Sequence, residues 1–421
     1  MTLTSRQDSL DFDAKHSLRS LREQYHIPQG LIYLDGNSLG VLPKATPDAL
    51  LLAIHQAWGN DLITSWNKAG WIHLPQHIGG MIASLIGAHA NEVIAADSTS
   101  INLFKVLAAA IKQNAKRKQI ISERSNFPTD LYMVEGLAAL LNQGHELVLI
   151  DDISQLTTKL NDDVAVVMLT QVDYRTGRKL ELGPITQQVQ ACGALMIWDL
   201  AHSAGAFTVD LNQANADYAV GCGYKYFNGG PGAPAFVFVA QRHHESFDQP
   251  LSGWLGHAAP FAFEPGYRPA AGVNRAICGT APILSMVALA TGVQSTVNAQ
   301  ALGGMPALEA KAHELTEYFL QLTAPLKQRF NLTPVCPMRA SERGNQVSFS
   351  LPDGVQAYAV VQALIARGVV GDFRAPNILR FGFAPLYVSF TDIWDAAQLI
   401  EEILETKTWD QEQYKARNAV T

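Results

Sequence analysis

Short, continuously apolar runs separated by helical patterns fill the middle of the chain. They predict strands at 93–97, 119–122, 146–150, 163–170, 194–200, 217–222 and 235–240. Between them, residues 101–113, 131–141 and a segment around 185–192 have the apolar spacing of helices. Strands that are apolar on both faces and alternate with helices are typical of a mainly parallel sheet covered on both sides. The predicted fold class is therefore α/β, with a mainly parallel seven-stranded sheet and helices on both faces.

The two ends of the chain have a different pattern. Leu10, Leu18, Leu21 and Tyr25 predict one amphipathic helix within residues 1–30. A short strand that leads into the turn at 35–37 and helices at 47–58 and 74–86 follow. After residue 300 the pattern predicts a smaller α+β domain, with helices at 306–322, 356–366 and 391–405 and strands at 346–350 and 378–383. We expect residues 1–60 to belong to the small domain, 61–304 to form the large domain, and 305–421 to complete the small one.

Composition narrows the class of protein. The 421 residues are 48% hydrophobic and 16% charged, which excludes a disordered chain. The net charge is −7 and the longest basic run is 116–118, so we expect no nucleic-acid partner. The four cysteines are far apart, which favours a reducing compartment over a disulfide framework. The first residues lack an apolar core and no stretch reaches the ~18 apolar residues of a membrane helix, so we expect a cytoplasmic protein without a membrane partner.

Ligands of such sheets bind at the carboxyl ends of the strands, where Lys225 is the first candidate. It follows an apolar strand, lies between two tyrosines and precedes a glycine-rich segment. Lysines that form Schiff bases need a partly desolvated setting of this kind. A surface lysine beside a turn is the alternative interpretation.

Asp199 is the second candidate because it ends the apolar run ALMIWDL. A carboxylate in such a place is costly unless it meets a cation or hydrogen-bond donors. It could cap the segment that follows, or bind a metal. It could also hold the proton on the ring nitrogen of pyridoxal phosphate, which makes that ring an electron sink.

Two further strand ends carry polar and aromatic residues. Thr99 and Ser100 begin a predicted helix, where hydroxyl and backbone N–H groups form an anion site or an ordinary cap. Phe127 follows the strand at 119–122, where its ring can stack on a planar cofactor or fill the core. Taken in chain order, anion site, aromatic ring, aspartate and lysine match the type I pyridoxal phosphate enzymes.

Longer motifs make the resemblance specific, because the chain resembles the kynureninase family over essentially its whole length. The motifs that carry the resemblance are YLDGNSLG (33–40), SWNKAGW (65–71), STSINLFKVL (98–107), SNFPTDLY (125–132), WDLAHSAGA (198–206), GCGYKYFNGGPG (221–232), LSGWLGH (251–257), ICGTAPILS (277–285) and RFGFAPLY (380–387). YLDGNSLG, and YKYFNGGPG together with GWLGH, are highly specific for this family.

The resemblance assigns roles to individual residues. It implies pyridoxal 5'-phosphate bound as a Schiff base at Lys225, with Asp199 at the ring nitrogen and Tyr224 as the candidate for later proton transfers. The cofactor-binding positions it implies are Thr99, Ser100, Phe127, Pro128, Thr129, Asp130, Thr170, Asp199, His202, Tyr224, Lys225, Trp254 and Thr280. The substrate-binding positions it implies are Arg380 for the carboxylate, and Trp66, Gly279, Thr280 and Asn37 on the aryl side. No metal is expected.

The same resemblance implies hydrolysis of L-kynurenine to anthranilate and L-alanine, within tryptophan degradation and the route toward NAD. It also implies a homodimer, in which Trp254 and Thr280 come from the neighbouring subunit. Trp66, Gly279 and Thr280 resemble the bacterial pattern that prefers kynurenine, so 3-hydroxykynurenine should be a weaker substrate.

Three other interpretations stay open at this point. A cysteine desulfurase or selenocysteine lyase would need a mobile nucleophilic cysteine, for which Cys336 is the candidate. A non-catalytic protein that kept the fold would be expected to have lost Lys225, Asp199 or Arg380, and all three are present. A metal-dependent hydrolase would have to use histidines such as the adjacent pair His243 and His244.

Overall fold

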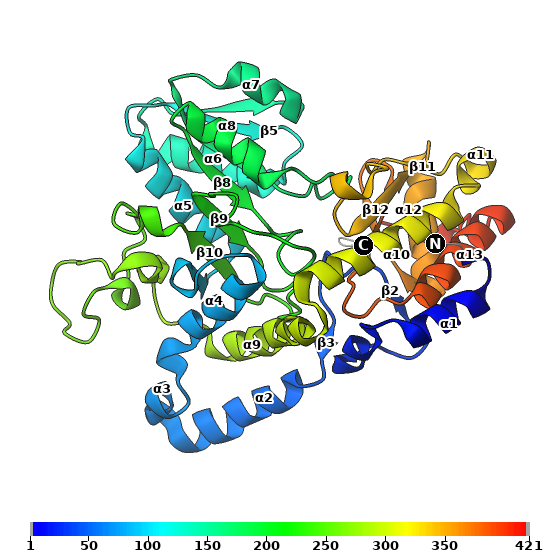
Figure 1. Cartoon of the computed structure of the whole chain (residues 1–421), viewed down its shortest axis with the longest axis horizontal. Helices are drawn as coiled ribbons and strands as arrows, with labels where there is room; N and C mark the ends of the chain where they lie inside the picture. Colours follow the sequence, from blue (N-terminus) through cyan, green and yellow to red (C-terminus); the bar gives the residue numbers. More distant parts are fainter. Residues whose placement is uncertain (1–2, 418–421) are drawn as a thin grey trace.

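A large sheet forms the core of the left-hand part of the molecule in the computed structural model, which describes residues 3–417 (Figure 1). Within those residues it has seven strands in the order β4-β10-β9-β8-β7-β5-β6. All of them run parallel except β10, which is antiparallel to both of its neighbours. Their bounds are β4 (Val93–Ala96), β5 (Gln119–Glu123), β6 (Glu146–Ile150), β7 (Val164–Thr170), β8 (Leu195–Asp199), β9 (Tyr218–Gly221) and β10 (Ala235–Val239). The seven strands and the mainly parallel sheet that the sequence predicts are confirmed.

Helices cover both faces of this sheet, and the strands alternate between two hydrophobic clusters. Met196 and Trp198 of β8 pack in one cluster, whereas Ile197 between them packs in the other. This alternation follows from the two-residue period of a strand. The surrounding helices are α4 (Leu74–Leu85), α5 (Thr99–Gln113), α6 (Pro128–Leu141), α7 (Leu156–Lys159), α8 (Leu182–Ala191) and α9 (Ile283–Val297).

A second, antiparallel sheet lies in the C-terminal part of the chain. Within the described residues it has four strands in the order β11-β12-β15-β14. These are β11 (Thr333–Pro334), β12 (Gln346–Ser350), β14 (Asp372–Arg374) and β15 (Ile378–Gly382). The helices of this part are α10 (Gly304–Thr323), α11 (Leu326–Phe330), α12 (Gly354–Ala366), α13 (Phe390–Thr406) and α14 (Glu412–Lys415). The predicted α+β pattern after residue 300 is therefore found.

The N-terminal segment packs on this C-terminal part, as the blue and orange-red elements in Figure 1 show. In α1 (Arg6–Lys15), Arg6 pairs with Asp395 of α13 at 2.7 Å. Strand β2 (Ile32–Tyr33) pairs with β13 (Val369–Val370) in parallel. These contacts agree with the predicted link between residues 1–60 and the small domain, and the boundaries at 60 and 304 stay predictions.

The single helix predicted within residues 1–30 is wrong. Helix α1 ends at Lys15 because His16 adopts an extended backbone, and its ring accepts the Leu18 N–H at 3.1 Å. A 3-10 helix (Arg19–Gln24) and strand β1 (Tyr25–His26) follow. Leu18 and Tyr25 are buried as predicted, but Leu10 is exposed, so the apolar residues do not share one helical face.

Residues 41–68 form an arm that runs along the lower edge of the molecule in Figure 1. It contains β3 (Leu42–Pro43), α2 (Thr46–Leu52), a π-helix (Ala53–Asp61) and α3 (Ser65–Lys68). The predicted helix at 47–58 is thus a short α-helix that continues as a π-helix. The large apolar side chains of the arm that face solvent are Leu42, Leu51, Leu52, Trp58, Leu62 and Ile63.

Candidate active site

The carboxyl ends of the parallel strands meet around one cavity. Thr170 ends β7 and Asp199 ends β8, and the two residues are direct partners in the sheet. Lys225 lies four residues beyond the end of β9. The residues that line the cavity are Thr99, Ser100, Phe127, Thr129, Asp130, Thr170, Tyr174, Asp199, Ala201, His202, Tyr224 and Lys225. All but Tyr174 and Ala201 were predicted from the sequence, and the predicted Pro128 is the first residue of α6 beside them.

Two buried carboxyl groups share the floor of this cavity. Asp130 and Asp199 are each 3% exposed, and the Thr170 hydroxyl lies 3.4 Å from the first and 3.5 Å from the second. Burial raises the pKa of Asp130 well above its ordinary value, and the negative charge of Asp199 raises it further. Burial also raises the pKa of Asp199, opposed by Lys225 and by the Ala201 N–H at 2.8 Å. The first proton therefore belongs on Asp130, and Asp199 stays the more acidic of the two.

Asn126 is a neighbour that sequence reasoning missed. Its side-chain oxygen accepts the Thr170 hydroxyl, and its amide donates to the Ser122 hydroxyl at 3.1 Å. Ser122 in turn donates to the Met168 carbonyl at 2.8 Å. Thr170 is thus held in place by a chain of hydrogen bonds that is anchored in β5 and β7. The motif SNFPTDLY contained Asn126, but its pattern gave no reason to single it out.

Lys225 contacts His202 directly. The Lys225 Nζ lies 2.9 Å from His202 Nε2, and the histidine is 5% exposed. Burial lowers the pKa of His202 well below its ordinary value, and the charges of Lys225 and Arg380 lower it further. His202 is therefore neutral and its Nε2 can accept a hydrogen bond from Lys225 Nζ, while its Nδ1 is buried without a hydrogen-bond partner.

The motif at 33–40 fixes the backbone of the lysine. The Gly40 N–H donates to the Tyr224 carbonyl at 2.7 Å. A Cβ at Gly40 would lie 2.3 Å from the Lys225 carbonyl oxygen, so only glycine permits this approach. A segment nearly 190 residues upstream thus positions the backbone of Lys225, the predicted Schiff-base residue.

The opposite wall of the cavity combines a helix end with an aromatic ring. Ser98 caps α5 by accepting the Ile101 N–H at 3.3 Å, so Thr99 and Ser100 are free of that task. The first N–H groups of a helix lack partners within it and attract anions. Phe127 is 44% exposed and meets Tyr174 edge to face at 5.3 Å between ring centres. The exposed ring overturns the interpretation of Phe127 as a core residue.

Arg380 lies behind the cavity wall. It is 1% exposed, and its Nη1 donates to the Tyr174 carbonyl at 2.8 Å. Asn37 reaches the same carbonyl through Gln346, since the Asn37 amide donates to Gln346 at 3.2 Å and Gln346 donates to Tyr174 at 3.2 Å. Tyr174 therefore joins the lysine cavity to both predicted substrate-binding residues of this side.

Besides Pro128, Asn37 and Arg380, four more predicted residues do not line this cavity. Trp66 lies on α3, where it contacts Trp71. Trp254, in a 3-10 helix (Trp254–Gly256), is 40% exposed and packs on Phe261. Gly279 and Thr280 are exposed as well. Their roles stay predictions, because one chain by itself does not bring them to Lys225.

The residues behind two of the other interpretations have structural roles. Cys336 is buried, and burial raises the pKa of its thiol, which disfavours the thiolate that a nucleophile needs. His243 contacts Asp217 at 2.7 Å and stacks on Tyr218. Within residues 3–417 we find no group of three or more His, Cys, Asp or Glu side chains placed to hold a metal ion.

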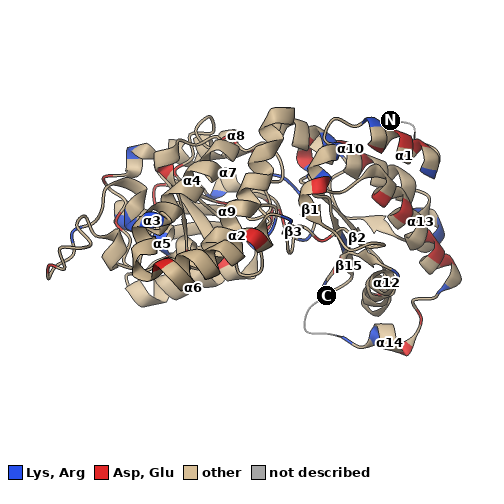
Figure 2. Cartoon of the chain, turned by 90° about the horizontal axis from the view of Figure 1, so that it is seen from below, with Lys and Arg blue, Asp and Glu red and all other residues tan. Residues whose placement is uncertain are grey.

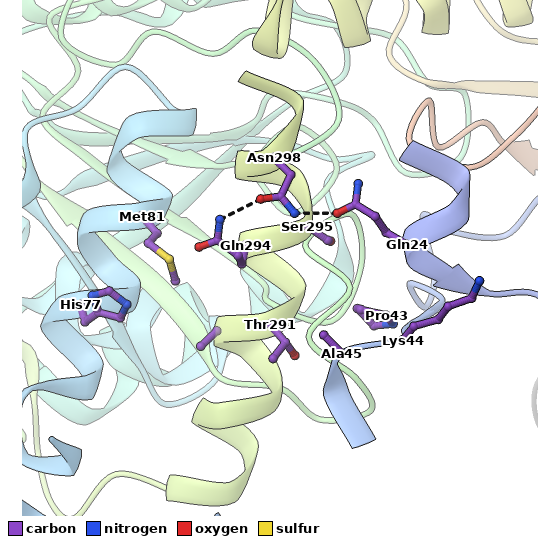
Figure 3. Close-up of a pocket in the computed structure, with 11 residues that line it drawn as sticks. Gln24, Pro43, Lys44, Ala45, His77, Met81, Thr291, Gln294, Ser295 and Asn298 are labelled. Carbon is purple, nitrogen blue, oxygen red and sulfur yellow. Dashed lines mark hydrogen bonds between the residues drawn. The ribbon is translucent and has the colours of Figure 1, made fainter. Parts of the chain in front are cut away.

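A wider groove of ≈ 440 Å³ lies elsewhere, between α4, α9 and the 3-10 helix at 19–24 (Figure 3). Its polar groups mostly bind one another. Gln294 donates to Asn298 at 2.9 Å, and Asn298 donates to Gln24 at 2.7 Å. None of the predicted site residues lines it, so size alone does not identify the candidate active site.

Solved structures define the class of this fold. The chain is similar to a cysteine desulfurase from Thermococcus onnurineus, with a TM-score of 0.75, 20% identity, and coverage of 92% of this chain and 98% of that one. It is also similar to a mutant of C-DES with glycine covalently linked to the pyridoxal phosphate cofactor, with a TM-score of 0.74, 18% identity, and coverage of 90% and 99%. These likenesses assign the fold to the type I pyridoxal phosphate enzymes.

Sequence relatives define the family. The chain is 50% identical over 423 aligned residues to the kynureninase of Pseudomonas fluorescens, covering 100% of both chains. It matches the kynureninase of Burkholderia mallei (strain SAVP1) with the same identity and coverage. Residues 308–400 match the model of the kynureninase C-terminal domain. The chain belongs to the kynureninase family.

Proposed function

We propose that this enzyme hydrolyses the Cβ–Cγ bond of L-kynurenine, with pyridoxal phosphate held at Lys225. One water is consumed, and the products are anthranilate and L-alanine. The observation that carries the proposal is the full-length 50% identity to curated kynureninases, joined to a cavity in which ten residues expected from that family meet. The fold alone would equally suit a desulfurase, but Cys336 is too deeply buried for that chemistry.

The cavity fits the cofactor chemically. Two buried carboxyls face a single lysine beside a neutral histidine, and a protonated ring nitrogen would add a second positive charge at Asp199. Thr99, Ser100 and the first turn of α5 would hold the phosphate group. Phe127 offers an exposed aromatic face for the ring. The cofactor supplies a conjugated electron sink for the charge that develops on the substrate carbons.

The protein's own groups then move and hold protons. Lys225 removes the proton from the substrate Cα, and neutral His202 accepts a hydrogen bond from its amine and keeps it directed into the cavity. Asp199 holds the proton at the ring nitrogen throughout. Tyr224 delivers a proton in the later steps, as the bond between Cβ and Cγ breaks after water has added to the carbonyl carbon. Arg380 binds the substrate carboxylate and so orients the bond that breaks.

The aryl side sets selectivity in this proposal. Trp66 provides an apolar wall, and Gly279 leaves space beside Thr280. Neither Trp66 nor Gly279 offers a hydrogen-bond partner dedicated to a 3-hydroxyl group. Kynurenine is therefore the preferred substrate and 3-hydroxykynurenine the weaker one.

A homodimer completes the site. Trp254 and Thr280 of one subunit bind the cofactor phosphate of the other. The support is that both residues are exposed and away from their own cavity, and that Trp254 packs on Phe261, which contacts Phe263, both of them exposed aromatic side chains. Large apolar residues that face solvent are typical of surfaces that bind protein.

The setting of the reaction follows from these assignments. We infer a role in tryptophan degradation, in a cytoplasmic enzyme whose products can feed NAD synthesis. Acidic residues gather on α1 and α13 while basic ones are scattered, which offers nucleic acid no basic surface in this view (Figure 2). No helix among residues 3–417 combines the length and apolar character needed to cross a bilayer.

Adding kynurenine to the purified protein tests the proposal. Anthranilate fluorescence should rise, and alanine should form in equal amount. Borohydride reduction followed by peptide mapping should find the cofactor on Lys225. Release of sulfur from cysteine without cleavage of kynurenine would overturn the assignment in favour of a desulfurase.

A further inference from the structure

Two carboxylates and two guanidinium groups meet beside the candidate active site. Asp372 of β14 and Arg380 of β15 are cross-strand partners, and Asp372 Oδ2 binds Arg380 Nη2. The same oxygen binds Arg374 Nη2 at 2.7 Å. Asp35, from the turn after β2, reaches the group from another part of the chain, with its Oδ1 3.7 Å from Arg380 Nη2.

The two carboxylates of this cluster differ in how many hydrogen bonds and ion pairs they make. Asp372 is fully buried and engages both arginines. Asp35 is 8% exposed, yet its Oδ1 has no hydrogen-bond partner. An unpartnered carboxylate oxygen in such a place is costly when charged. Asp35 is therefore the member of this cluster that gains most from carrying a proton.

The pKa of Asp35 also indicates that this carboxyl can carry a proton near neutral pH. Burial and the negative charge of Asp372 raise the pKa of Asp35 to about 7, opposed by Arg380, the Ser38 hydroxyl and Arg374. The other titratable groups that sense this region are the tyrosines Tyr33, Tyr226 and Tyr387 and the histidine His202. Burial raises the pKa of each tyrosine and lowers that of His202, so all four stay neutral near neutral pH.

The net charge of the cluster then depends on one proton. With Asp35 ionised, two guanidinium groups face two carboxylates and the cluster is neutral. With Asp35 protonated, the cluster carries one positive charge, which an arriving carboxylate would neutralise. When Asp35 is ionised, its negative charge would repel a further carboxylate that approaches Arg380.

We propose that Asp35 is a positioning residue that must be protonated for Arg380 to receive the substrate carboxylate, so that substrate binding takes up a proton. This rests on the proposed function, which makes Arg380 the carboxylate site. The sign follows from linkage, because an anion that binds beside Asp35 favours its protonated form. Affinity for a carboxylate is then highest at low pH and falls as pH rises through the titration of Asp35.

The test uses 4-(2-aminophenyl)-4-oxobutanoate, which is kynurenine without its α-amino group, as a competitive inhibitor of the holoenzyme. Its inhibition constant should rise by about tenfold for each pH unit above the titration of Asp35. The Asp35→Asn variant, which is permanently neutral there, should keep the tight low-pH value across the range. Asp11→Asn, the same change at an exposed position of α1, should retain the pH dependence of the unmodified enzyme.

A matched probe separates this effect from other titrations in the site. The ketone 1-(2-aminophenyl)propan-1-one lacks the carboxylate, so its inhibition constant should not share the slope. Calorimetry of the unmodified holoenzyme in two buffers of different ionisation enthalpy should show net proton uptake with the carboxylate probe and none with the ketone. This measurement applies even where Asp35→Asn fails to fold.

The possible outcomes separate the role of Asp35 from the proposed function on which it rests. Carboxylate binding that is independent of pH, or an equal slope in Asp35→Asn, overturns the role of Asp35 and leaves the proposed function standing. A carboxylate probe that never competes with kynurenine, while kynurenine is cleaved, overturns Arg380 as the receptor and the role of Asp35 with it. Failure to cleave kynurenine at any pH overturns the proposed function itself.

Discussion

The cofactor side and the aryl side of the site are built in different ways. On the cofactor side, Asp130, Thr170, Asp199 and Lys225 come from strand ends of one sheet and meet in a single chain. On the aryl side, Trp66 lies on the arm and Gly279 and Thr280 lie on a loop, and all three are partly or fully exposed. The parallel sheet assembles the first group because its strand ends share one edge. The second group is not brought to Lys225 within one chain, and in the proposed homodimer a second copy would supply the missing surface.

The largest expected effect belongs to the centre of the cofactor side. Lys225→Ala removes both the anchor and the base, so turnover should fall by at least about 10⁴-fold. Anthranilate fluorescence measures the rate, and circular dichroism checks that the fold survives. A variant that still turned over at a tenth of the normal rate would contradict the assignment.

Asp199→Asn tests the acidic partner in the same region. A neutral amide cannot hold the ring proton by charge, so turnover should fall by about 10²- to 10³-fold with cofactor still bound. The rate of exchange of the substrate Cα proton with deuterated water, followed by NMR, reports this step directly. Asp151→Asn, at an exposed carboxylate that pairs with Arg124, serves as the matched control and should exchange normally. Normal exchange in Asp199→Asn would mean that another group holds the proton.

Mixing two inactive variants tests whether Trp254 and Thr280 act across the subunit interface. Lys225→Ala and the double variant Trp254→Ala, Thr280→Ala should each be poorly active alone. After subunit exchange, half of the dimers are mixed and one of the two sites in each is intact, so about a quarter of normal activity should return. Light scattering that shows an active monomer, or a mixture that regains no activity, would mean that neither residue acts across the subunit interface.

The smallest effect concerns selectivity on the aryl side. A desolvated 3-hydroxyl without a partner costs about 1–3 kcal/mol, so kcat/KM should favour kynurenine over 3-hydroxykynurenine by roughly 5- to 150-fold. Introducing Trp66→His together with Thr280→Asn supplies hydrogen-bonding groups and should narrow or reverse the ratio. Equal kcat/KM values for the two substrates on the unmodified enzyme would show that these residues do not form the pocket wall.

Some residues of the candidate site could be predicted because a local sequence pattern marks them. Lys225 and Asp199 stood out because a charged residue ends an apolar run, which short-range sequence shows directly. The N-terminal helix was mispredicted because Leu18 and Tyr25 are buried outside α1, on either side of the 3-10 helix at 19–24, so their spacing mimicked a helical period. For Phe127 the local pattern left a stacking ring and a core residue both open, and its 44% exposure in the folded chain decided against the core.

By itself the sequence determined the strands, the order of the motifs along the chain and the chemistry each motif carries, because apolar periodicity and strand ends are local properties. Tertiary structure alone decided the antiparallel direction of β10, the meeting of Asp130 with Asp199 and the path from Tyr174 through Arg380 to Asp35. Asp35 is far in the chain from Asp372 and Arg380, and only packing brings their charges together. The pKa values of Asp35 and Asp130 rise through burial beside a second carboxylate, a condition that exists only in the folded chain.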